Sequence, residues 1–99
     1  GVNNMMSNNG NNKLVLQSDG NLVLYSLGNA KWSSGTAGSG SNNSLIMQGD
    51  GNLVLYSSSG KVLWASGTKG SGNYLQIQDD GNLVIYNSSN TSLWATNTN

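Results

Sequence analysis

The chain has 99 residues, and its four lysines and four aspartates give a formal net charge of zero. Asn, Ser and Gly account for 17, 16 and 14 residues, whereas Arg, Glu, His, Cys, Pro and Phe are absent. The lack of Cys and His excludes disulfides, thiolate metal sites and the usual general base. Four lysines provide no basic patch for nucleic acid, and no apolar stretch approaches the ~20 residues of a membrane span. The first residue is not Met and no leader follows it, so we expect a mature or trimmed product, and the compartment stays open.

Three segments of the chain align without gaps: LVLQSDGNLVLYS at 14–26, LIMQGDGNLVLYS at 45–57 and LQIQDDGNLVIYN at 75–87. A tryptophan follows each segment, at Trp32, Trp64 and Trp94. The apolar residues alternate with polar ones, which is typical of strands, and Gly/Ser/Asn-rich stretches separate the segments. The sequence therefore predicts one domain over 1–99 with three internal repeats at about 5–36, 37–68 and 69–99.

Each segment reads as a β-hairpin, and the alternation decides its loop length. In the first unit, a two-residue loop would pair Gln17 with Leu22 and place an amide and a leucine on one face. A three-residue loop at 18–20 instead pairs Gln17 with Asn21 and separates apolar from polar residues, because a one-residue slip inverts the two faces. Such a loop needs a left-handed last residue, and Gly20 occupies that position.

The same register in all three units predicts an aliphatic inner face. Its members are Leu14, Leu16, Leu22, Leu24, Leu45, Met47, Leu53, Leu55, Leu75, Ile77, Leu83 and Ile85. With the three tryptophans as large core residues, the pattern predicts an all-β fold of three antiparallel sheets around a pseudo-threefold axis. The first unit lacks a preceding tryptophan segment, so we expect the C-terminal strand to complete the first sheet. It would do so within the chain or by exchange with a partner in a homodimer.

The outer face of each hairpin repeats an amide, a carboxylate, a second amide, an aliphatic side chain and a phenol. These residues are Gln17, Asp19, Asn21, Val23 and Tyr25; Gln48, Asp50, Asn52, Val54 and Tyr56; and Gln78, Asp80, Asn82, Val84 and Tyr86. Sugar hydroxyls both donate and accept hydrogen bonds, which suits this mixture. Asp-Gly is also common turn chemistry, and recent duplication also preserves neutral residues. The linkers have diverged while these positions have not, which favours a ligand-binding face.

Other polar residues carry weaker signals. We expect the serines, threonines and four lysines to be solvated surface. Asp79 alternates away from Asp80, so the two carboxylates do not form a catalytic pair.

The pattern Gln-x-Asp-x-Asn-x-Val-x-Tyr, three times complete and followed by segments such as LWASGT (63–68), resembles the bulb-type (GNA-like) mannose-binding lectin family. The resemblance runs from about residue 5 to the end and implies a β-prism II fold with three four-stranded sheets and calcium-independent mannose binding. In that family the Asn and Asp bind the axial 2-hydroxyl of mannose, the Gln binds the 3-hydroxyl, the Tyr binds the 4-hydroxyl, and the Val contacts the ring carbons. The resemblance implies these roles for Asn21, Asp19, Gln17, Tyr25 and Val23 and for their counterparts in the other two units.

Two features depart from the family pattern. Many plant members have one disulfide, and here Gly20 and Ser44 stand where its cysteines would be. The N-terminus also looks about one strand shorter than in plant members. Both departures leave a plant-type dimer or tetramer in question.

The predicted function is a lectin with three equivalent shallow sites per chain, which binds mannose-rich glycans multivalently without cofactor, metal or catalysis. A glycosidase is disfavoured, because such enzymes need two carboxylates roughly 5–9.5 Å apart and each unit supplies one suitable Asp. The alternative is a β-prism scaffold that binds no sugar, or a bacteriocin-like interaction module. A β-trefoil also has three units, but its repeats are longer than the 30 or 31 residues that separate the glutamines here.

Overall fold

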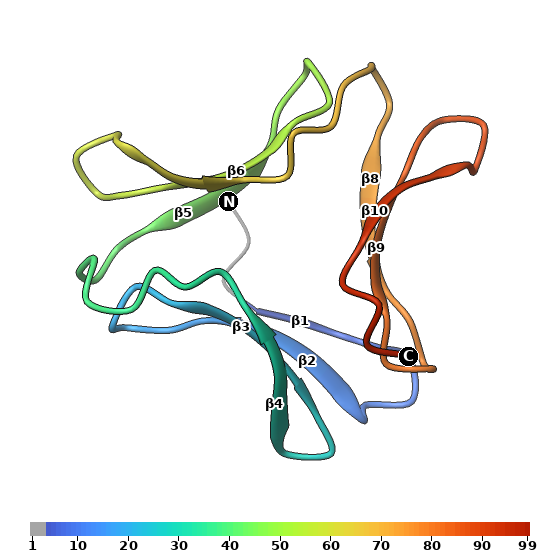
Figure 1. The fold of residues 1–99 in the computed structure, drawn as a ribbon, viewed down its shortest axis with the longest axis horizontal. Helices are drawn as coiled ribbons and strands as arrows, with labels where there is room; N and C mark the ends of the chain where they lie inside the picture. The colour runs from blue at the N-terminus through green and yellow to red at the C-terminus, as the bar shows by residue number, and fades with distance from the viewer. Residues whose placement is uncertain (1–3) are drawn as a thin grey trace.

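A computed structural model describes residues 4–99, so the first three residues of the predicted domain lie outside the described part. Ten strands form three antiparallel sheets, in the orders β1-β2-β3-β4, β5-β6-β7 and β10-β9-β8. The strands are β1 (Asn4–Met6), β2 (Asn12–Leu16), β3 (Leu22–Ser26), β4 (Asn29–Ser33), β5 (Ser44–Met47), β6 (Leu53–Tyr56), β7 (Val62–Ala65), β8 (Tyr74–Ile77), β9 (Leu83–Tyr86) and β10 (Ser92–Ala95). Figure 1 shows the sheets as three walls around a common centre, which confirms the predicted β-prism II architecture.

The hairpin register is the predicted one. In the first unit Lys13 lies opposite Tyr25, and the backbone N–H of Gln17 donates to the carbonyl of Asn21 at 2.8 Å. The corresponding bonds in the second and third units are both 2.9 Å. Gly20 closes the three-residue loop with a φ of +92°, a conformation that side chains with a Cβ rarely adopt. The leucines therefore face inward and the polar set faces outward.

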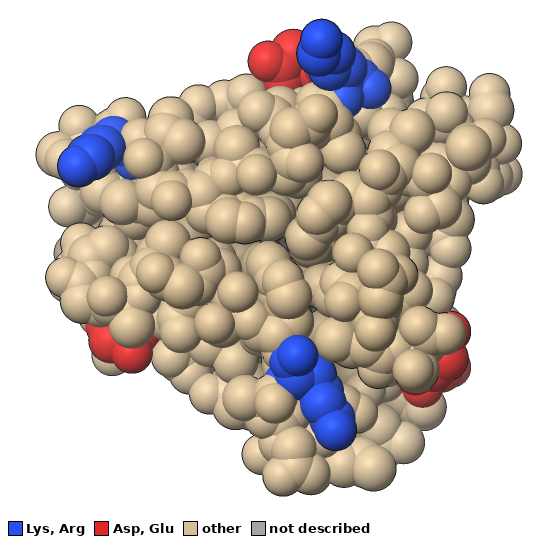
Figure 2. Space-filling model, in the orientation of Figure 1, with Lys and Arg blue, Asp and Glu red and all other residues tan. Residues whose placement is uncertain are grey.

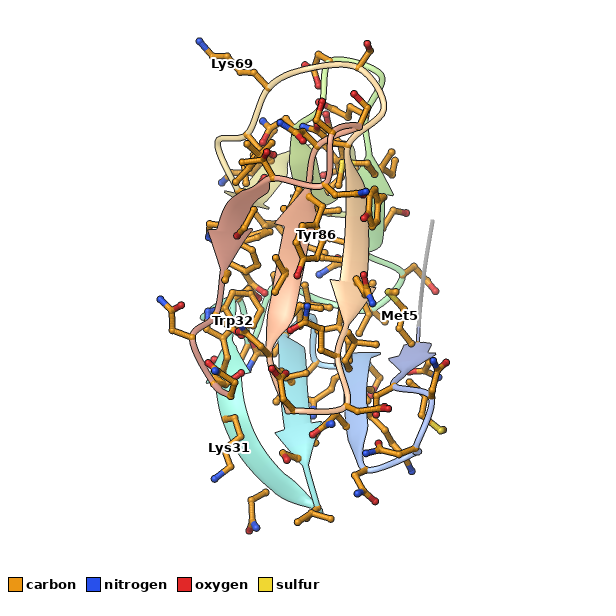
Figure 3. The ribbon with its side chains drawn as sticks, turned by 90° about the vertical axis from the view of Figure 1, so that its right-hand side faces the viewer. Met5, Lys31, Trp32, Lys69 and Tyr86 are labelled. Atoms are coloured by element: carbon orange, nitrogen blue, oxygen red, sulfur yellow. The ribbon has the colours of Figure 1, made fainter. Side chains whose placement is uncertain are left out.

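The inner face forms one hydrophobic core. Nine of the twelve predicted residues are buried in a single cluster, and Leu16, Met47 and Leu75 are partly buried against it. Trp32, Trp64 and Trp94 pack on this cluster and contact one another edge to face, with ring centroids 5.4–5.6 Å apart. Edge-to-face contacts of this kind stabilise a cluster by about 0.5–1.5 kcal/mol per pair beyond area burial. Figure 3 shows Trp32 and Met5 on opposite sides of the edge-on molecule, so the tryptophans occupy one end of the prism.

The first sheet is not completed in the predicted way. β10 pairs with β9 in its own sheet, and the fourth strand of the first sheet is β1, which pairs with β2. The expectation that the C-terminal strand completes the first sheet within the chain is therefore wrong. The two other sheets have three strands each among residues 4–99, not the four that the resemblance implies. As a result, the outer edges of β5 and β8 carry no neighbouring strand in the described chain.

Three buried asparagines tie the units together, and we call them the clasp asparagines. Each lies at or just before the first hairpin strand of its unit and donates its side-chain amide to a carbonyl at the hairpin turn of the neighbouring unit. The bonds are Asn43 to Gly20 at 3.2 Å, Asn73 to Gly51 at 3.0 Å, and Asn12 to Gln78 and Asp79 at 3.0 and 3.2 Å. Asp79 also accepts a 2.9 Å bond from the backbone N–H of Asn9 through Oδ1. Figure 1 shows the resulting contact between the loop after β1 and the β8–β9 hairpin.

Charged side chains are few and dispersed. All four lysines are exposed, as predicted, and Figure 2 shows most of one face without any charge. No helix among residues 4–99 has the length and apolar character to cross a membrane.

Candidate functional site

The structure brings the five repeated residues of each unit onto one outer sheet face. We call these sets site 1 (first unit), site 2 (second unit) and site 3 (third unit). In every site the Asp is exposed, and the Gln, Asn and Tyr are half-buried. Figure 3 shows Tyr86 on the outer face of the third sheet, which faces the viewer. The valines share this face, but Val23, Val54 and Val84 are only 4%, 2% and 2% exposed. They therefore form the floor of each site.

In the aspartate of each site, one carboxylate oxygen bonds to the hairpin turn and the other faces solvent. In site 1, Oδ1 of Asp19 accepts the backbone N–H of Asn21 at 2.9 Å, and the same bond measures 3.0 and 2.9 Å in sites 2 and 3. This bond is ordinary Asx-turn chemistry, so the turn interpretation of Asp-Gly accounts for one oxygen. The second oxygen accepts no hydrogen bond from residues 4–99, and the exposed position leaves it open to a ligand.

The asparagine of each site has a fixed orientation, because its Oδ1 accepts hydrogen bonds from the segment that follows the tryptophan. In site 2, Asn52 accepts from the backbone N–H of Gly67 at 2.9 Å and from the hydroxyl of Ser66 at 3.2 Å. Asn21 accepts from Ser34 and Thr36, and Asn82 accepts from Thr96, Asn97 and Thr98. With Oδ1 directed at the scaffold, Nδ2 is the outward atom, a donor that no described residue engages.

In each unit, two hydroxyl groups that follow the tryptophan support the orientation of the site asparagine. This pair was not predicted from the sequence. In site 2, Thr68 donates its hydroxyl hydrogen to the carbonyl of Gly51 at 2.6 Å. Ser66 is therefore the donor in the 2.8 Å contact between the two hydroxyls, and it shares its one hydrogen between Thr68 and Asn52. Ser34 with Thr36 and Thr96 with Thr98 repeat the arrangement. The expectation that serines and threonines are solvated surface is wrong for these six residues, because each position is needed to fix the Asn and the turn. Their recurrence two residues apart after every tryptophan was the available signal.

The glutamine and tyrosine of each site lie on either side of the valine and hydrogen-bond to each other. Nε2 of the Gln donates to Oη of the Tyr in all three units, joining Gln17 to Tyr25, Gln48 to Tyr56 and Gln78 to Tyr86. This bond leaves Oε1 of the Gln as an acceptor and the Tyr hydroxyl hydrogen as a donor. Every site thus presents two donors and two acceptors around an apolar floor.

The surroundings of the three sites differ. Beside site 1, Lys13 lies opposite Tyr25 and lines a hollow together with Met6 and other residues of β1 and β2. A hollow at site 2 is lined by Asp50, Asn52 and Lys69. Figure 3 shows Lys69 at the upper end of the molecule in that view. Site 3 borders Tyr74 of β8.

Each repeated set contains one carboxylate, from Asp19, Asp50 or Asp80. Across residues 4–99, no group of three His, Cys, Asp or Glu side chains is placed to hold a metal ion. The second acidic residue beside site 3, Asp79, is engaged by the backbone N–H of Asn9 and lies outside the repeated set.

Several solved structures of similar chains match nearly the whole length of this protein. A monomeric mannose-binding lectin from Gastrodia elata is 42% identical, with 99% of each chain covered and a TM-score of 0.84. The mannose-specific agglutinin from snowdrop (Galanthus nivalis), solved with methyl-α-D-mannoside, is 40% identical over 99% of this chain and 98% of that chain, with a TM-score of 0.74. A lectin from Marasmius oreades is 33% identical over 96% of this chain and 80% of that chain, with a TM-score of 0.85. Neither a protein-family model nor a curated protein matches this chain.

These similarities place the chain in one class, the β-prism II lectins. The chain belongs to the bulb-type (GNA-like) mannose-binding lectin family. This family binds sugars without catalysis, in agreement with the prediction that the protein is not an enzyme.

Proposed function

We propose that this protein is a calcium-independent lectin that binds mannose through sites 1, 2 and 3. The observation that carries the proposal is the threefold repetition of one hydrogen-bonding arrangement. In each unit the Asn amide is turned outward by its Oδ1 bonds, and the Asp keeps one carboxylate oxygen in the turn. The similar snowdrop agglutinin, which was solved in complex with methyl-α-D-mannoside, gives independent support.

The outward atoms supply both partners that a sugar hydroxyl needs. In site 2, Nδ2 of Asn52 donates to the hydroxyl oxygen and the outer carboxylate oxygen of Asp50 accepts its hydrogen, a charge-assisted bond. The family resemblance assigns this hydroxyl to the axial 2-position, which separates mannose from glucose. Oε1 of Gln48 and the hydroxyl of Tyr56 then bind the 3- and 4-hydroxyls over the valine floor. No step requires a metal ion.

A single site of this kind binds weakly, because it is shallow and water competes for every polar group. We expect a dissociation constant of roughly millimolar for one mannose at one site. Three sites on three walls allow multivalent binding to mannose-rich glycans, with gains of about 10²–10⁴ where the geometry permits simultaneous contact.

Assembly would add further valency. A homodimer formed by exchange of the C-terminal strand stays a prediction, in which β10 of one copy leaves its place beside β9 and pairs with the other copy. Analytical ultracentrifugation across a hundredfold range of protein concentration tests it, and a monomer throughout would contradict it.

The function is tested by titrating ¹⁵N-labelled protein with methyl α-mannoside, with methyl α-glucoside as the control sugar. The side-chain amide signals of Asn21, Asn52 and Asn82 report each site separately. We expect all three to shift with mannoside, unchanged by EDTA, and to shift far less with glucoside. No shift at tens of millimolar mannoside would refute the proposal and favour a β-prism scaffold without sugar binding.

A further inference from the structure

An aromatic pair borders site 3 and neither of the other sites. Tyr74 of β8 lies directly opposite Tyr86 of β9 in the sheet register. The two rings stack, with centroids 5.6 Å apart and an interplanar angle of 28°. Tyr86 belongs to site 3, so the stacked partner is a direct extension of that site.

Tyr74 is held in place although it is exposed. Its hydroxyl donates to Oδ1 of Asn90 at 2.7 Å, and Asn90 sits in the turn between β9 and β10 with a φ of +63°. The side chain is nevertheless 39% exposed, and the outer edge of β8 carries no strand in the described chain. A ring fixed by a stack on one face and by its hydroxyl at the tip, and open at a sheet edge, is preorganised to receive a ligand.

The equivalent positions of the other units lack this platform. Ser44 lies opposite Tyr56 in the second unit, and Lys13 lies opposite Tyr25 in the first. In the second unit the position of Asn90 is taken by Gly60, which has a φ of +88°, and no residue beyond its two chain neighbours has an atom within 4 Å of where a Cβ would stand. Sites 1 and 2 therefore share the five repeated residues with site 3 but not the anchored aromatic ring.

Resting on the proposed mannose binding, we propose that Tyr74 makes site 3 an extended site that also binds the second sugar ring of an oligomannoside. The C–H face of a hexose packs on an aromatic ring, whose surface is large and costs little side-chain entropy to order. The first mannose occupies the five repeated residues, and the second ring lies against Tyr74 at the end of the site away from the hairpin turn. The three sites are then equivalent toward a monosaccharide and different toward a disaccharide.

The test measures a ratio at each site by NMR titration with the Asn52 and Asn82 amide signals. The ratio is the dissociation constant of methyl α-mannoside divided by that of an α1,2-, α1,3- or α1,6-linked mannobiose. The doubled number of mannose units in a disaccharide affects both sites equally and cancels in the comparison. For at least one linkage we expect the ratio at site 3 to exceed that at site 2 by about three- to tenfold, the range of one aromatic contact.

Substitutions separate stacking from other causes. Tyr74→Ala should lower the site 3 ratio to the site 2 value while methyl α-mannoside binding at site 3 is kept. Tyr74→Phe should retain most of the difference, because it preserves the ring. The double substitution Ser44→Tyr with Gly60→Asn should raise the ratio at site 2, and this gain does not depend on the fold tolerating Tyr74→Ala.

The outcomes are distinct. Equal ratios at sites 2 and 3 for all three mannobioses, with methyl α-mannoside bound at both, would overturn this inference and leave the proposed function intact. An unchanged ratio in Tyr74→Ala would overturn it as well. No binding of methyl α-mannoside at any site would overturn the proposed function and this inference together.

Discussion

Replacing Asn52 with Asp should silence site 2 without unfolding the domain. The substitution is isosteric, so one carboxylate oxygen keeps the bonds that Oδ1 accepts from Gly67 at 2.9 Å and Ser66 at 3.2 Å. The outward Nδ2 becomes a second acceptor beside Asp50, and the sugar hydroxyl loses its donor. The lost bond joins a neutral amide to a neutral hydroxyl, and the hydroxyl oxygen is left facing a carboxylate without a donor. This loss costs about 1–3 kcal/mol, which corresponds to roughly fivefold to hundredfold weaker binding.

The assay is the mannoside titration described above, together with urea unfolding. The amide signals of Asn21 and Asn82 should still shift in the Asn52→Asp protein, and the free energy of unfolding should change by less than about 1 kcal/mol, because the scaffold bonds persist. Asn29→Asp, the same chemical change at an exposed residue of β4, controls for the added charge.

Two results would refute this reasoning. Wild-type affinity at site 2 would show that Nδ2 of Asn52 is not the donor to the sugar. A loss of more than about 3 kcal/mol of stability would show that the Asn orientation described above is wrong, since the isosteric acceptor would then not replace it.

Three further predictions concern stability and are read by urea unfolding. Gly51→Ala should destabilise the domain by several kcal/mol, because the new Cβ would lie 2.2 Å from the carbonyl oxygen and 2.5 Å from the backbone nitrogen of Gly70. Gly60→Ala, at nearly the same φ but in open space, should cost only about 1 kcal/mol, and equal costs would contradict the packing argument. Asn73→Asp should lower the free energy of unfolding by about 3 kcal/mol or more, because a buried carboxylate would face the carbonyls of Gly51 and Lys69, each now 3.0 Å from the amide. An unchanged free energy of unfolding would mean that water reaches the side chain of residue 73. Thr68→Val should lower the free energy of unfolding by about 1–3 kcal/mol, because Thr68 is only 8% exposed and its hydroxyl donates a 2.6 Å bond to the carbonyl of Gly51. Mannoside affinity should fall at site 2 and stay unchanged at sites 1 and 3. An equal loss of affinity at all three sites would indicate a global effect.

The hairpins were predictable because one local rule governs them. The alternation of apolar residues in each segment allows only the three-residue loop, and the register with Lys13 opposite Tyr25 follows from it. The repetition of five outer positions predicted three candidate sites, whose mannose binding stays a proposal. The burial of Val23 was not predicted, since alternation assigns a face and does not tell how deeply its neighbours cover a side chain.

Features set by contacts between distant segments could not be predicted in the same way. β1 has only three residues and no alternation, so the sequence offered no reason to place it beside β2. The hydroxyl network was hidden because Ser34 and Thr36 are two among many serines and threonines, most of which occur in linkers. Tyr74 belongs to no repeated set, and only the pairing across strands brings it to Tyr86.

The boundary between the third unit and the first lacks the covalent connection that the other two boundaries have. The first unit is linked to the second, and the second to the third, by a peptide segment as well as by an asparagine amide. Among residues 4–99, the hydrogen bonds between the third unit and the first come from the amide of Asn12 and from the backbone N–H and side chain of Asn9, and no peptide segment backs them. Core packing such as the 5.6 Å contact between Trp32 and Trp94 also joins these two units, but no continuous chain supports it, so thermal opening should begin where Asn9 and Asn12 release the β8–β9 hairpin.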